Sequence, residues 1–181
     1  RELWKSDGSA AGTVQVGDIS TVPGGSAPQE LTKVGNALFF SATNDLFDTE
    51  LYKSDGSTVT LVQNVNPSGS SNPTEIVDVN GIAYFRANDG TNGAELWKTN
   101  AAGTSASMVE NLNPGGSSNP GDFAAIGDTV YFRANDGTSG VELYESDGSD
   151  VDLVENIAPD PGSSFPQDLT NVGGTLLFSA Y

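Results

Sequence analysis

The chain has 181 residues, enough for one domain with a hydrophobic core, and its acidic side chains outnumber its basic ones 24 to 7. The net charge of −17 disfavours nucleic acid and anionic lipid as partners. Because the chain has neither cysteine nor histidine, it lacks thiolate and imidazole groups for catalysis or metal binding.

A short phrase recurs four times, as ELWKSDGS (2–9), ELYKSDGS (50–57), ELWKTNAA (95–102) and ELYESDGS (142–149). The phrase glutamates are 48, 45 and 47 residues apart. A period of this length is typical of a solenoid, a propeller or a repeat array. Each copy predicts a strand, and in three copies an Asp-Gly turn follows it.

The predicted strands follow the same order in every repeat. Residues 1–22 hold the first phrase strand, its turn, and an alternating strand over 13–19. A loop rich in Pro, Gly and Ser then leads to residues 27–66, where two strands flank a tight turn before the phrase strand returns. Residues 73–113 and 120–158 repeat this order, and 166–181 supply only the first two strands of another round.

Two-residue turns mark antiparallel hairpins, because they supply the positive φ that tight hairpins need. These turns are Gly35-Asn36, Asn80-Gly81, Gly127-Asp128 and Gly173-Gly174. Each whole unit is therefore expected to form a four-stranded antiparallel sheet, with each Pro/Gly/Ser loop crossing to the next sheet. Leu3 and Trp4 are adjacent and point to opposite faces of a strand, so both faces of a sheet are expected to pack on neighbours. No helical pattern is present.

These features predict one all-β domain over residues 1–181, a β-propeller of four-stranded blades. The whole blades would be 27–66, 73–113 and 120–158, with half-blades at 1–22 and 166–181. Pairing of residues 176–180 with 2–6 would close a four-bladed ring and remove exposed sheet edges. Half of an eight-bladed dimer and a fragment of a longer propeller are open alternatives, and a β-solenoid is the structural rival.

The phrase, its Asp-Gly turn and the Ala-Ala-Gly-Thr of 10–13 and 101–104 resemble the bacterial ELWxxDGT repeat family. The likeness covers nearly the whole chain. It departs from the family pattern where Tyr replaces Trp, where Asn100 stands in place of the Asp-Gly turn, and in the shorter second and fourth turns. The resemblance implies secreted or surface-attached bacterial proteins whose repeats build propellers, and it implies no reaction.

The phrase glutamates are the first candidate site: Glu2, Glu50, Glu95 and Glu142. Repetition places them at equivalent depths, so one hypothesis is a ring of cation or ligand contacts. The favoured interpretation is structural, with each carboxylate accepting hydrogen bonds from backbone N–H groups or pairing with an arginine. Arg86 and Arg133, at matching positions of two repeats, are the candidate partners.

Asn and Asp side chains crowd several turns and suggest calcium, which prefers hard oxygen ligands. The candidate ligands are Asn88, Asp89, Asn92, Asn135, Asp136, Asp147, Asp150 and Asp152. No stretch matches an EF-hand loop, and Asx residues form turns without any metal, which is the favoured interpretation. Calcium is thus the one cofactor that the sequence suggests.

The phrase aromatics, Trp4, Tyr52, Trp97 and Tyr144, are candidates for stacking on sugar rings. One such residue per repeat, inside a strand, favours packing between blades instead. Catalysis has little support, because serines lack a histidine to activate them, the repeated lysines indicate a scaffold, and no carboxylate pair stands out for glycoside hydrolysis. We expect no catalytic residue.

The chain shows no signal peptide and begins at Arg1 inside a motif, which predicts a mature or excised fragment. No apolar run approaches the roughly 18 residues of a membrane span, so no membrane insertion is expected. The expected function is a non-catalytic scaffold, secreted or on a bacterial surface, that binds a protein or glycan surface in adhesion. The alternative is a lectin-like propeller with one shallow site per blade or blade pair, and a homodimer through open blade edges is a further expectation.

Overall fold

The computed structural model describes residues 1–158 and 162–181, and every regular element in them is a β-strand. The strands form three four-stranded antiparallel sheets and, at the two ends of the chain, two two-stranded sheets. The first small sheet is β1 (Trp4–Lys5) with β2 (Val14–Gln15), and the last is β15 (Gln167–Val172) with β16 (Thr175–Ser179). The all-β prediction is therefore confirmed.

The three complete sheets have the strand order that the repeat predicts. The first contains β3 (Gln29–Val34), β4 (Ala37–Thr43), β5 (Thr49–Ser54) and β6 (Val59–Gln63). The second contains β7 (Thr74–Val79), β8 (Ile82–Asn88), β9 (Ala94–Thr99) and β10 (Ala106–Met108). The third contains β11 (Gly121–Ile126), β12 (Thr129–Asn135), β13 (Val141–Ser146) and β14 (Asp152–Glu155). The phrase strand is the third strand of each sheet.

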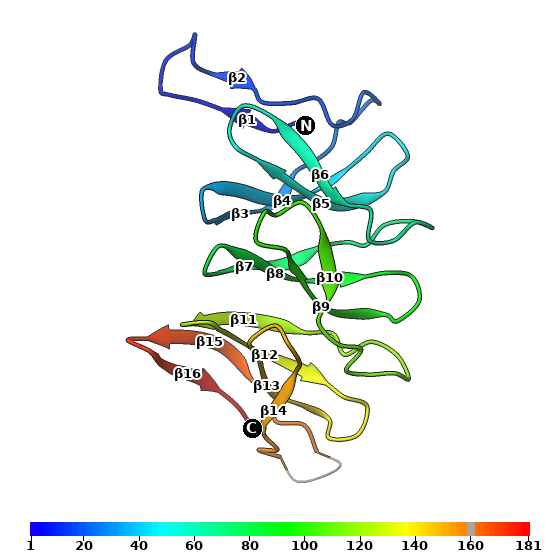
Figure 1. Ribbon diagram of the computed structural model, residues 1–181, viewed down its shortest axis with the longest axis vertical. Helices are drawn as coiled ribbons and strands as arrows, with labels where there is room; N and C mark the ends of the chain where they lie inside the picture. Colours follow the sequence, from blue (N-terminus) through cyan, green and yellow to red (C-terminus); the bar gives the residue numbers. More distant parts are fainter. Residues whose placement is uncertain (159–161) are drawn as a thin grey trace.

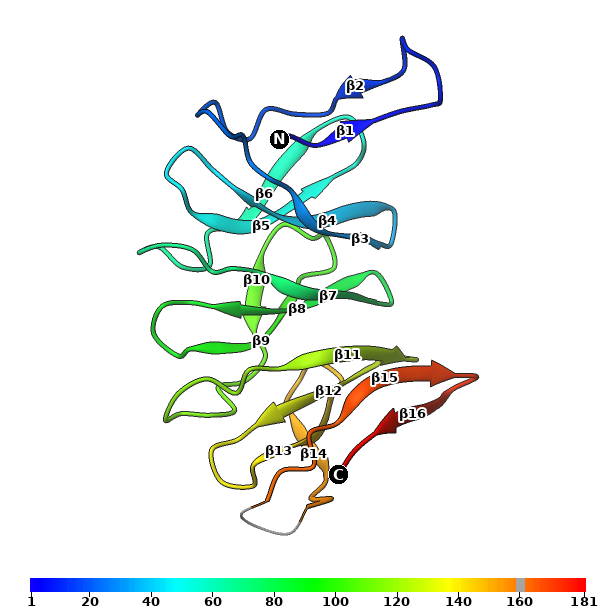
Figure 2. The same ribbon diagram turned by 180° about the vertical axis from the view of Figure 1, so that it is seen from behind.

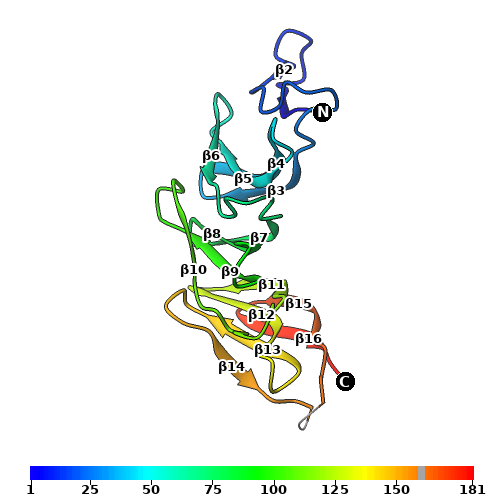
Figure 3. The same ribbon diagram turned by 90° about the vertical axis from the view of Figure 1, so that its right-hand side faces the viewer.

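The sheets are stacked one on the next along the long axis of the molecule (Figure 1). Their first strands lie side by side: β3 contacts β7, β7 contacts β11, and β11 contacts β15. Seen edge-on, the first strands lie on one side of the stack and the last strands β6, β10 and β14 on the other (Figure 3). Each Pro/Gly/Ser loop carries the chain from the last strand of one sheet to the first strand of the next.

The hydrophobic core lies between the sheets and uses both faces of each one. Phe39 packs in the cluster between the first two complete sheets, whereas its neighbour Phe40 packs on the β1–β2 side with Leu3 and Tyr52. Adjacent residues of a strand point to opposite faces, so paired large apolar residues fill two separate interfaces. This confirms the two-faced packing expected from the phrase.

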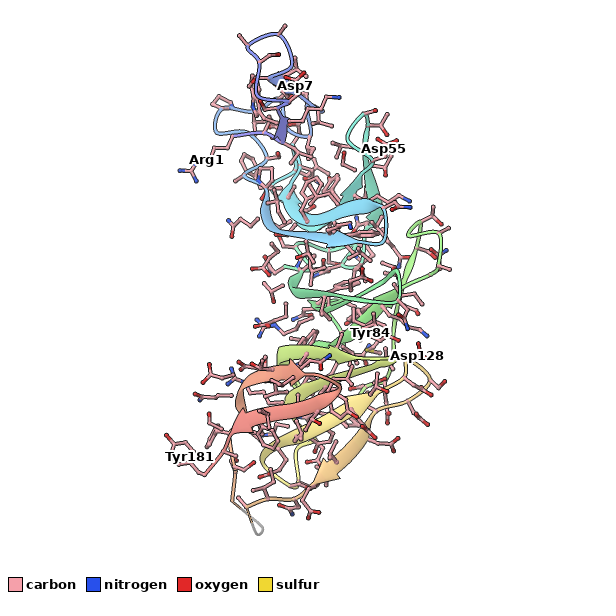
Figure 4. All side chains as sticks on the ribbon, turned by 90° about the vertical axis from the view of Figure 1, so that its left-hand side faces the viewer. Arg1, Asp7, Asp55, Tyr84, Asp128 and Tyr181 are labelled. Atoms are coloured by element: carbon pink, nitrogen blue, oxygen red, sulfur yellow. The ribbon has the colours of Figure 1, made fainter. Side chains whose placement is uncertain are left out.

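The predicted closure of a ring within one chain is not present in the structure. The β1–β2 and β15–β16 hairpins remain separate two-stranded sheets, and both views place them at opposite ends of the stack (Figures 1 and 2). The reason is the stacking itself, because each repeat advances the chain along the long axis through contacts between first strands. Four repeats therefore leave Arg1 and Tyr181 far apart (Figure 4).

Candidate functional site

The phrase glutamates bind the loop that crosses to the next sheet. The carboxylate of Glu50 accepts hydrogen bonds from the backbone N–H of Val65 (3.0 Å), from the N–H of Ser71 (2.9 Å) and from the Ser71 hydroxyl (2.6 Å). Val65 follows strand β6, and Ser71 lies in the Pro/Gly/Ser loop. One side chain thus fastens both ends of the crossing segment to its own sheet.

The same three hydrogen bonds recur in every repeat. Their donors are Ile19 and Ser26 for Glu2, Leu112 and Ser118 for Glu95, and Ile157 and Ser164 for Glu142. The Ser-to-Glu contacts are short, at 2.5–2.6 Å between oxygens, as expected for hydroxyl bonds to a carboxylate. The structural interpretation of the phrase glutamates is confirmed, because their carboxylate oxygens accept hydrogen bonds from backbone N–H groups and serine hydroxyls of the crossing segment.

The environment of the glutamates differs between the end repeat and the inner ones. Burial raises the pKa of Glu50 and Glu95 in spite of the hydrogen bonds that they accept. At Glu2 burial acts in the same direction, but the hydroxyl and N–H of Ser26 and the N–H of Ile19 outweigh it and lower the pKa. Glu2 precedes β1 of a two-stranded sheet and is more exposed than Glu50 or Glu95, which lie within strands of complete sheets.

The predicted pairing of these glutamates with arginine is not found among the described residues. Arg133 instead pairs with Asp122, at 2.8 Å between its Nη1 and the Asp122 Oδ2. Asp122 belongs to a set of residues that the sequence analysis missed, which we name the acidic row: Glu30, Glu75, Asp122 and Asp168. Each of them follows the crossing-loop proline by two residues, and this spacing was the signal available in the sequence.

The acidic row is built on a repeated irregularity of the first strands. In each first strand the pairing with the second strand shifts register across the acidic residue. All four acidic residues adopt φ of 56–59°. This left-handed conformation is costly for a residue with a side chain, roughly 1–2 kcal/mol. Hydrogen bonds along the row offset it: Glu75 N–H donates to Glu30 (3.1 Å), and Asp168 N–H donates to Asp122 (3.3 Å).

The phrase aromatics lie mostly in the core. Tyr52, Trp97 and Tyr144 are buried, with 8%, 7% and 1% of their surface exposed, and Tyr52 and Tyr144 stack on Phe40 and Phe132 of the neighbouring strand. Trp4 is the exception, at 58% exposed: the equivalent Trp97 packs against the preceding sheet, whereas no described strand covers the outer face of the β1–β2 sheet. The first three are therefore closed to a sugar ring in this structure.

The candidate calcium ligands fall at three separate turns of the fold. Asn88, Asp89 and Asn92 occupy the β8–β9 turn, and Asn135 and Asp136 occupy the β12–β13 turn. The other candidates, Asp147, Asp150 and Asp152, lie around the β13–β14 turn at the opposite end of the sheet. No group of three or more acidic residues suited to a metal is found over residues 1–158 and 162–181. Calcium binding stays a prediction.

Asx geometry accounts for these turns in detail. Asp136 Oδ1 accepts the N–H groups of Thr138 (2.8 Å) and Ser139 (2.7 Å), while its Oδ2 accepts both of their hydroxyls. In the preceding repeat, Asp89 accepts the N–H groups of Thr91 and Asn92 in the same way. Each aspartate therefore holds its own turn, as Asx residues do in turns without a metal.

We expect Asp136→Asn to lower the free energy of unfolding by about 1–2 kcal/mol at pH 7. Burial acts to raise the pKa of Asp136, but hydrogen bonds from Ser139 and Thr138 outweigh it and lower the pKa to about 2. A lowered pKa contributes stability above the unfolded-state pKa, near 3.8, and this stability is lost as the pH falls toward 2.

Urea unfolding of the variant and the original chain between pH 7 and pH 2.5 measures this effect. The difference between them should shrink as the pH falls below about 4. The matched control is Asp18→Asn, which removes the same charge from an exposed position and should change stability by less than about 0.5 kcal/mol. A loss at Asp136 that is equal at both pH values would contradict the prediction.

Two of the repeated lysines each tie their sheet to the next, as the scaffold interpretation predicts. Lys5 Nζ donates to the carbonyl of Gly56 (2.8 Å), and Lys53 Nζ donates to the carbonyl of Ala102 (2.8 Å). Both acceptors lie in the turn between the phrase strand and the strand after it, one repeat further along. In Figure 4 the turn that carries Asp55 projects from the side of the stack, and the turn that carries Asp7 lies at its upper end.

A shallow hollow occurs at the same place in several repeats, between neighbouring crossing loops. The hollow of about 410 Å³ at the third complete sheet, which we name the arginine hollow, is lined by Arg86, Asn119, Arg133, Asn135 and Phe165, among others. Two repeats earlier, a hollow of about 170 Å³ has Ser41 in the place of Arg133 and Thr43 in the place of Asn135. The position is shared, but its chemistry varies.

No family model matches the chain, and no curated protein matches its sequence. The likeness to ELWxxDGT repeats therefore stays a resemblance. In the described part of the chain, no helix is long and apolar enough to cross a membrane.

Proposed function

We propose that the protein is a non-catalytic repeat scaffold of a β-propeller type, secreted or displayed on a bacterial surface, that binds a protein or glycan surface. The observation that carries the proposal is the repeated bond from each phrase glutamate to a crossing-loop serine. The most strongly repeated polar residues are thereby used in joints between sheets. Repeated residues that serve as joints between neighbouring units are typical of a solenoid or propeller scaffold.

Variation between repeats supports a binding role. The joints are constant, whereas the equivalent hollows carry arginines at the third complete sheet and hydroxyls at the first. Repeat scaffolds commonly bind through surface positions that vary while the packing positions stay constant. The hollows are thus the part of the molecule that we assign to recognition.

A lectin-like function is the second candidate, and the arginine hollow favours it. Asparagine and arginine side chains beside the exposed ring of Phe165 offer hydrogen bonds and an apolar surface together, as sugars require. Arg133 already pairs with Asp122, so the guanidinium of Arg86 is the group that favours a saccharide that carries a carboxylate, since arginine binds carboxylates through paired hydrogen bonds. The equivalent hollows at the first and third complete sheets support one shallow site per blade pair.

A glycan array with neutral and carboxylate-bearing saccharides separates the two candidates. The lectin function predicts binding of short acidic saccharides that Arg86→Ala weakens at least tenfold and that Lys33→Ala leaves unchanged. Lys33 is the control because it is an exposed cation outside the hollow. If no saccharide binds even at high density, the lectin function is rejected and the protein-binding scaffold remains. Turnover on a panel of polysaccharides would contradict the non-catalytic proposal.

A further inference from the structure

A second kind of hollow lies between the first two complete sheets, in the middle of the chain. Its volume is about 460 Å³, and its walls are the β3–β4 turn, the β7–β8 turn and residues 101–103 of the β9–β10 turn. The two hairpin turns follow each other along one side of the stack (Figure 1). The arginine hollow lies at the other end of the strands, beside the crossing loops. The two hollows are therefore separate sites.

This hollow is open because a glycine stands where the next repeat has an asparagine. Gly35 occupies the position in its hairpin turn that Asn80 occupies in the following one. The amide of Asn80 donates to the carbonyl of Gly127 (3.3 Å) and to the Asp128 carboxylate, and so bridges two hairpin turns. Gly35 has no side chain to bridge to Gly81, although a Cβ there would lie only 3.6 Å from the Gly81 Cα. The space between these two turns therefore stays unfilled.

The third wall departs from the repeat as well. Three copies of the phrase turn read Ser-Asp-Gly-Ser, whereas residues 99–102 read Thr-Asn-Ala-Ala. Gly103 then lies directly against an aromatic ring, since a Cβ on it would come within 2.6 Å of the Phe39 Cζ. The lining is mostly apolar as a result, and its apolar members are Val34, Ala37, Phe39, Ile82, Ala101 and Ala102.

One lining residue is charged, and for this reason we name the site the lysine hollow. The Nζ of Lys53 donates to the carbonyl of Ala102 (2.8 Å), which fixes the ammonium at the hollow and uses one of its three N–H groups. In the described part of the chain the ion pair found is Arg133 with Asp122. Lys53 therefore has N–H groups to offer and no carboxylate of the protein paired with it.

The next boundary between sheets shows what Lys53 lacks. Lys98 is the equivalent lysine, and it lies near Asp147 of the following phrase turn. The N–H and hydroxyl of Ser149 hold the pKa of Asp147 below its usual value, and the Lys98 ammonium lowers it further. At the lysine hollow, Asn100 stands where Asp147 stands in that turn. The repeat thus supplies an acidic neighbour to Lys98 and a neutral one to Lys53.

We propose that the lysine hollow binds a small molecule that joins one carboxylate to a compact apolar group, such as an aromatic or branched aliphatic acid. The carboxylate pairs with the ammonium of Lys53, in the place of the aspartate that this copy of the turn lacks. The apolar group lies against Val34 and Ile82. The volume of the hollow falls in the usual range for small ligands, roughly 300–1,000 Å³.

The acidic surroundings restrict the ligand to a single negative charge. The net charge of −17 disfavours polyanions throughout the molecule. Asp78 is the carboxylate bonded to the two hairpin turns, where it accepts the N–H groups of Gly35 (2.9 Å) and Gly81 (2.7 Å). Each of its oxygens is thus bonded to a protein donor, and Asp78 is not part of the lining. A monocarboxylate therefore meets the ammonium of Lys53 as the charged group of the hollow.

Titration of the isotope-labelled chain with phenylacetate, followed by NMR at neutral pH, tests the proposal. The N–H signals of Gly35, Gly81 and Gly103, which line the hollow, should shift together, with a dissociation constant of roughly 0.1–3 mM. Phenylacetamide has the same shape without the charge, and acetate has the charge without the ring, so each should bind at least fivefold more weakly. Equal binding of phenylacetate and phenylacetamide, or no shift at these glycines with about 10 mM phenylacetate, would overturn the proposal.

Lys53→Gln tests the charge, because glutamine keeps an N–H donor for the Ala102 carbonyl and loses the ammonium. We expect phenylacetate to bind this variant at least fivefold more weakly, while the weak binding of phenylacetamide stays the same. Lys5→Gln is the matched control, since Lys5 makes the equivalent bond to the carbonyl of Gly56 at the preceding boundary. Phenylacetate binding that is unchanged in Lys53→Gln would contradict the proposed pairing.

Gly35→Asn tests the space, because it gives this hairpin turn the side chain that the next turn already has. Gly35 has φ of 55° and Asn80 has φ of 51°, and asparagine tolerates this left-handed conformation. The new side chain should fill the opening and weaken phenylacetate binding at least fivefold. Gly127→Asn is the matched control, at φ of 59° in the third hairpin turn, where a Cβ meets nothing within 4 Å. Unchanged binding by a folded Gly35→Asn chain would place the ligand elsewhere and overturn the proposal.

Discussion

Replacing Glu95 with alanine is expected to lower the free energy of unfolding by about 2–6 kcal/mol, because one buried and one partly buried N–H group each lose their acceptor at roughly 1–3 kcal/mol apiece. These donors are Leu112 (3.3 Å) and Ser118 (2.8 Å), and Glu95 itself is fully buried. The Ser118 hydroxyl loses its 2.5 Å bond as well. Urea or thermal unfolding measures the loss.

The matched control is Glu155→Ala, which removes an exposed glutamate from strand β14 and should cost less than about 0.5 kcal/mol. Glu95→Gln should fall between the two, since its amide carbonyl still accepts one N–H while its amide nitrogen faces the other donors. In a stack of repeats the crossing loop joins neighbouring sheets, so we also expect Glu95→Ala to broaden the transition. A Glu95→Ala chain as stable as Glu155→Ala would contradict the joint function of the phrase glutamates.

Strand content and sheet composition follow from the repeat in the sequence. The turns at Asn80-Gly81 and Gly127-Asp128 join first and second strands as predicted, because tight hairpins need the positive φ that these residues tolerate. The Pro/Gly/Ser loops cross between sheets, and Leu51 and Tyr52 pack on opposite faces. Local patterns determine such features, so one sequence suffices to predict them.

The angle between successive sheets, in contrast, does not follow from the repeat. A repeat period states how many residues each unit has, but it carries no angle between one unit and the next. That angle depends on how side chains such as Phe39 and Phe85 fit between two sheets. The predicted pairing of residues 176–180 with 2–6 in one chain assumed a complete turn in four repeats, which the structure does not have.

The candidate site was predictable to a similar extent. Repetition favoured a structural function for Glu50 and its equivalents, and the hydrogen bonds confirm it. The predicted pairing of glutamate with Arg133 was wrong, because Arg133 reaches Asp122 on the adjacent first strand. Asp122 faces it only because the strand is irregular at that point, with φ of 56°, and an alternating strand pattern does not predict such irregularities.

Replacing Trp97 with alanine is expected to cost about 3–5 kcal/mol, the usual loss for a buried tryptophan. Trp97 is 7% exposed and belongs to the cluster between the first two complete sheets. Trp4 occupies the same position of the repeat but is 58% exposed, so Trp4→Ala should cost less than about 1 kcal/mol in dilute protein. Denaturant unfolding of both variants over a range of protein concentrations provides the comparison.

The dependence of the Trp4→Ala cost on concentration distinguishes three arrangements of the chain ends. A cost that stays small at every concentration indicates ends without a partner. A cost that grows with concentration indicates that β1 is covered by a second copy, since binding stabilises a folded chain in proportion to the logarithm of partner concentration. A cost as large as that of Trp97→Ala, even at the highest dilution, would require β1 to be covered within its own chain, and would contradict the open stack.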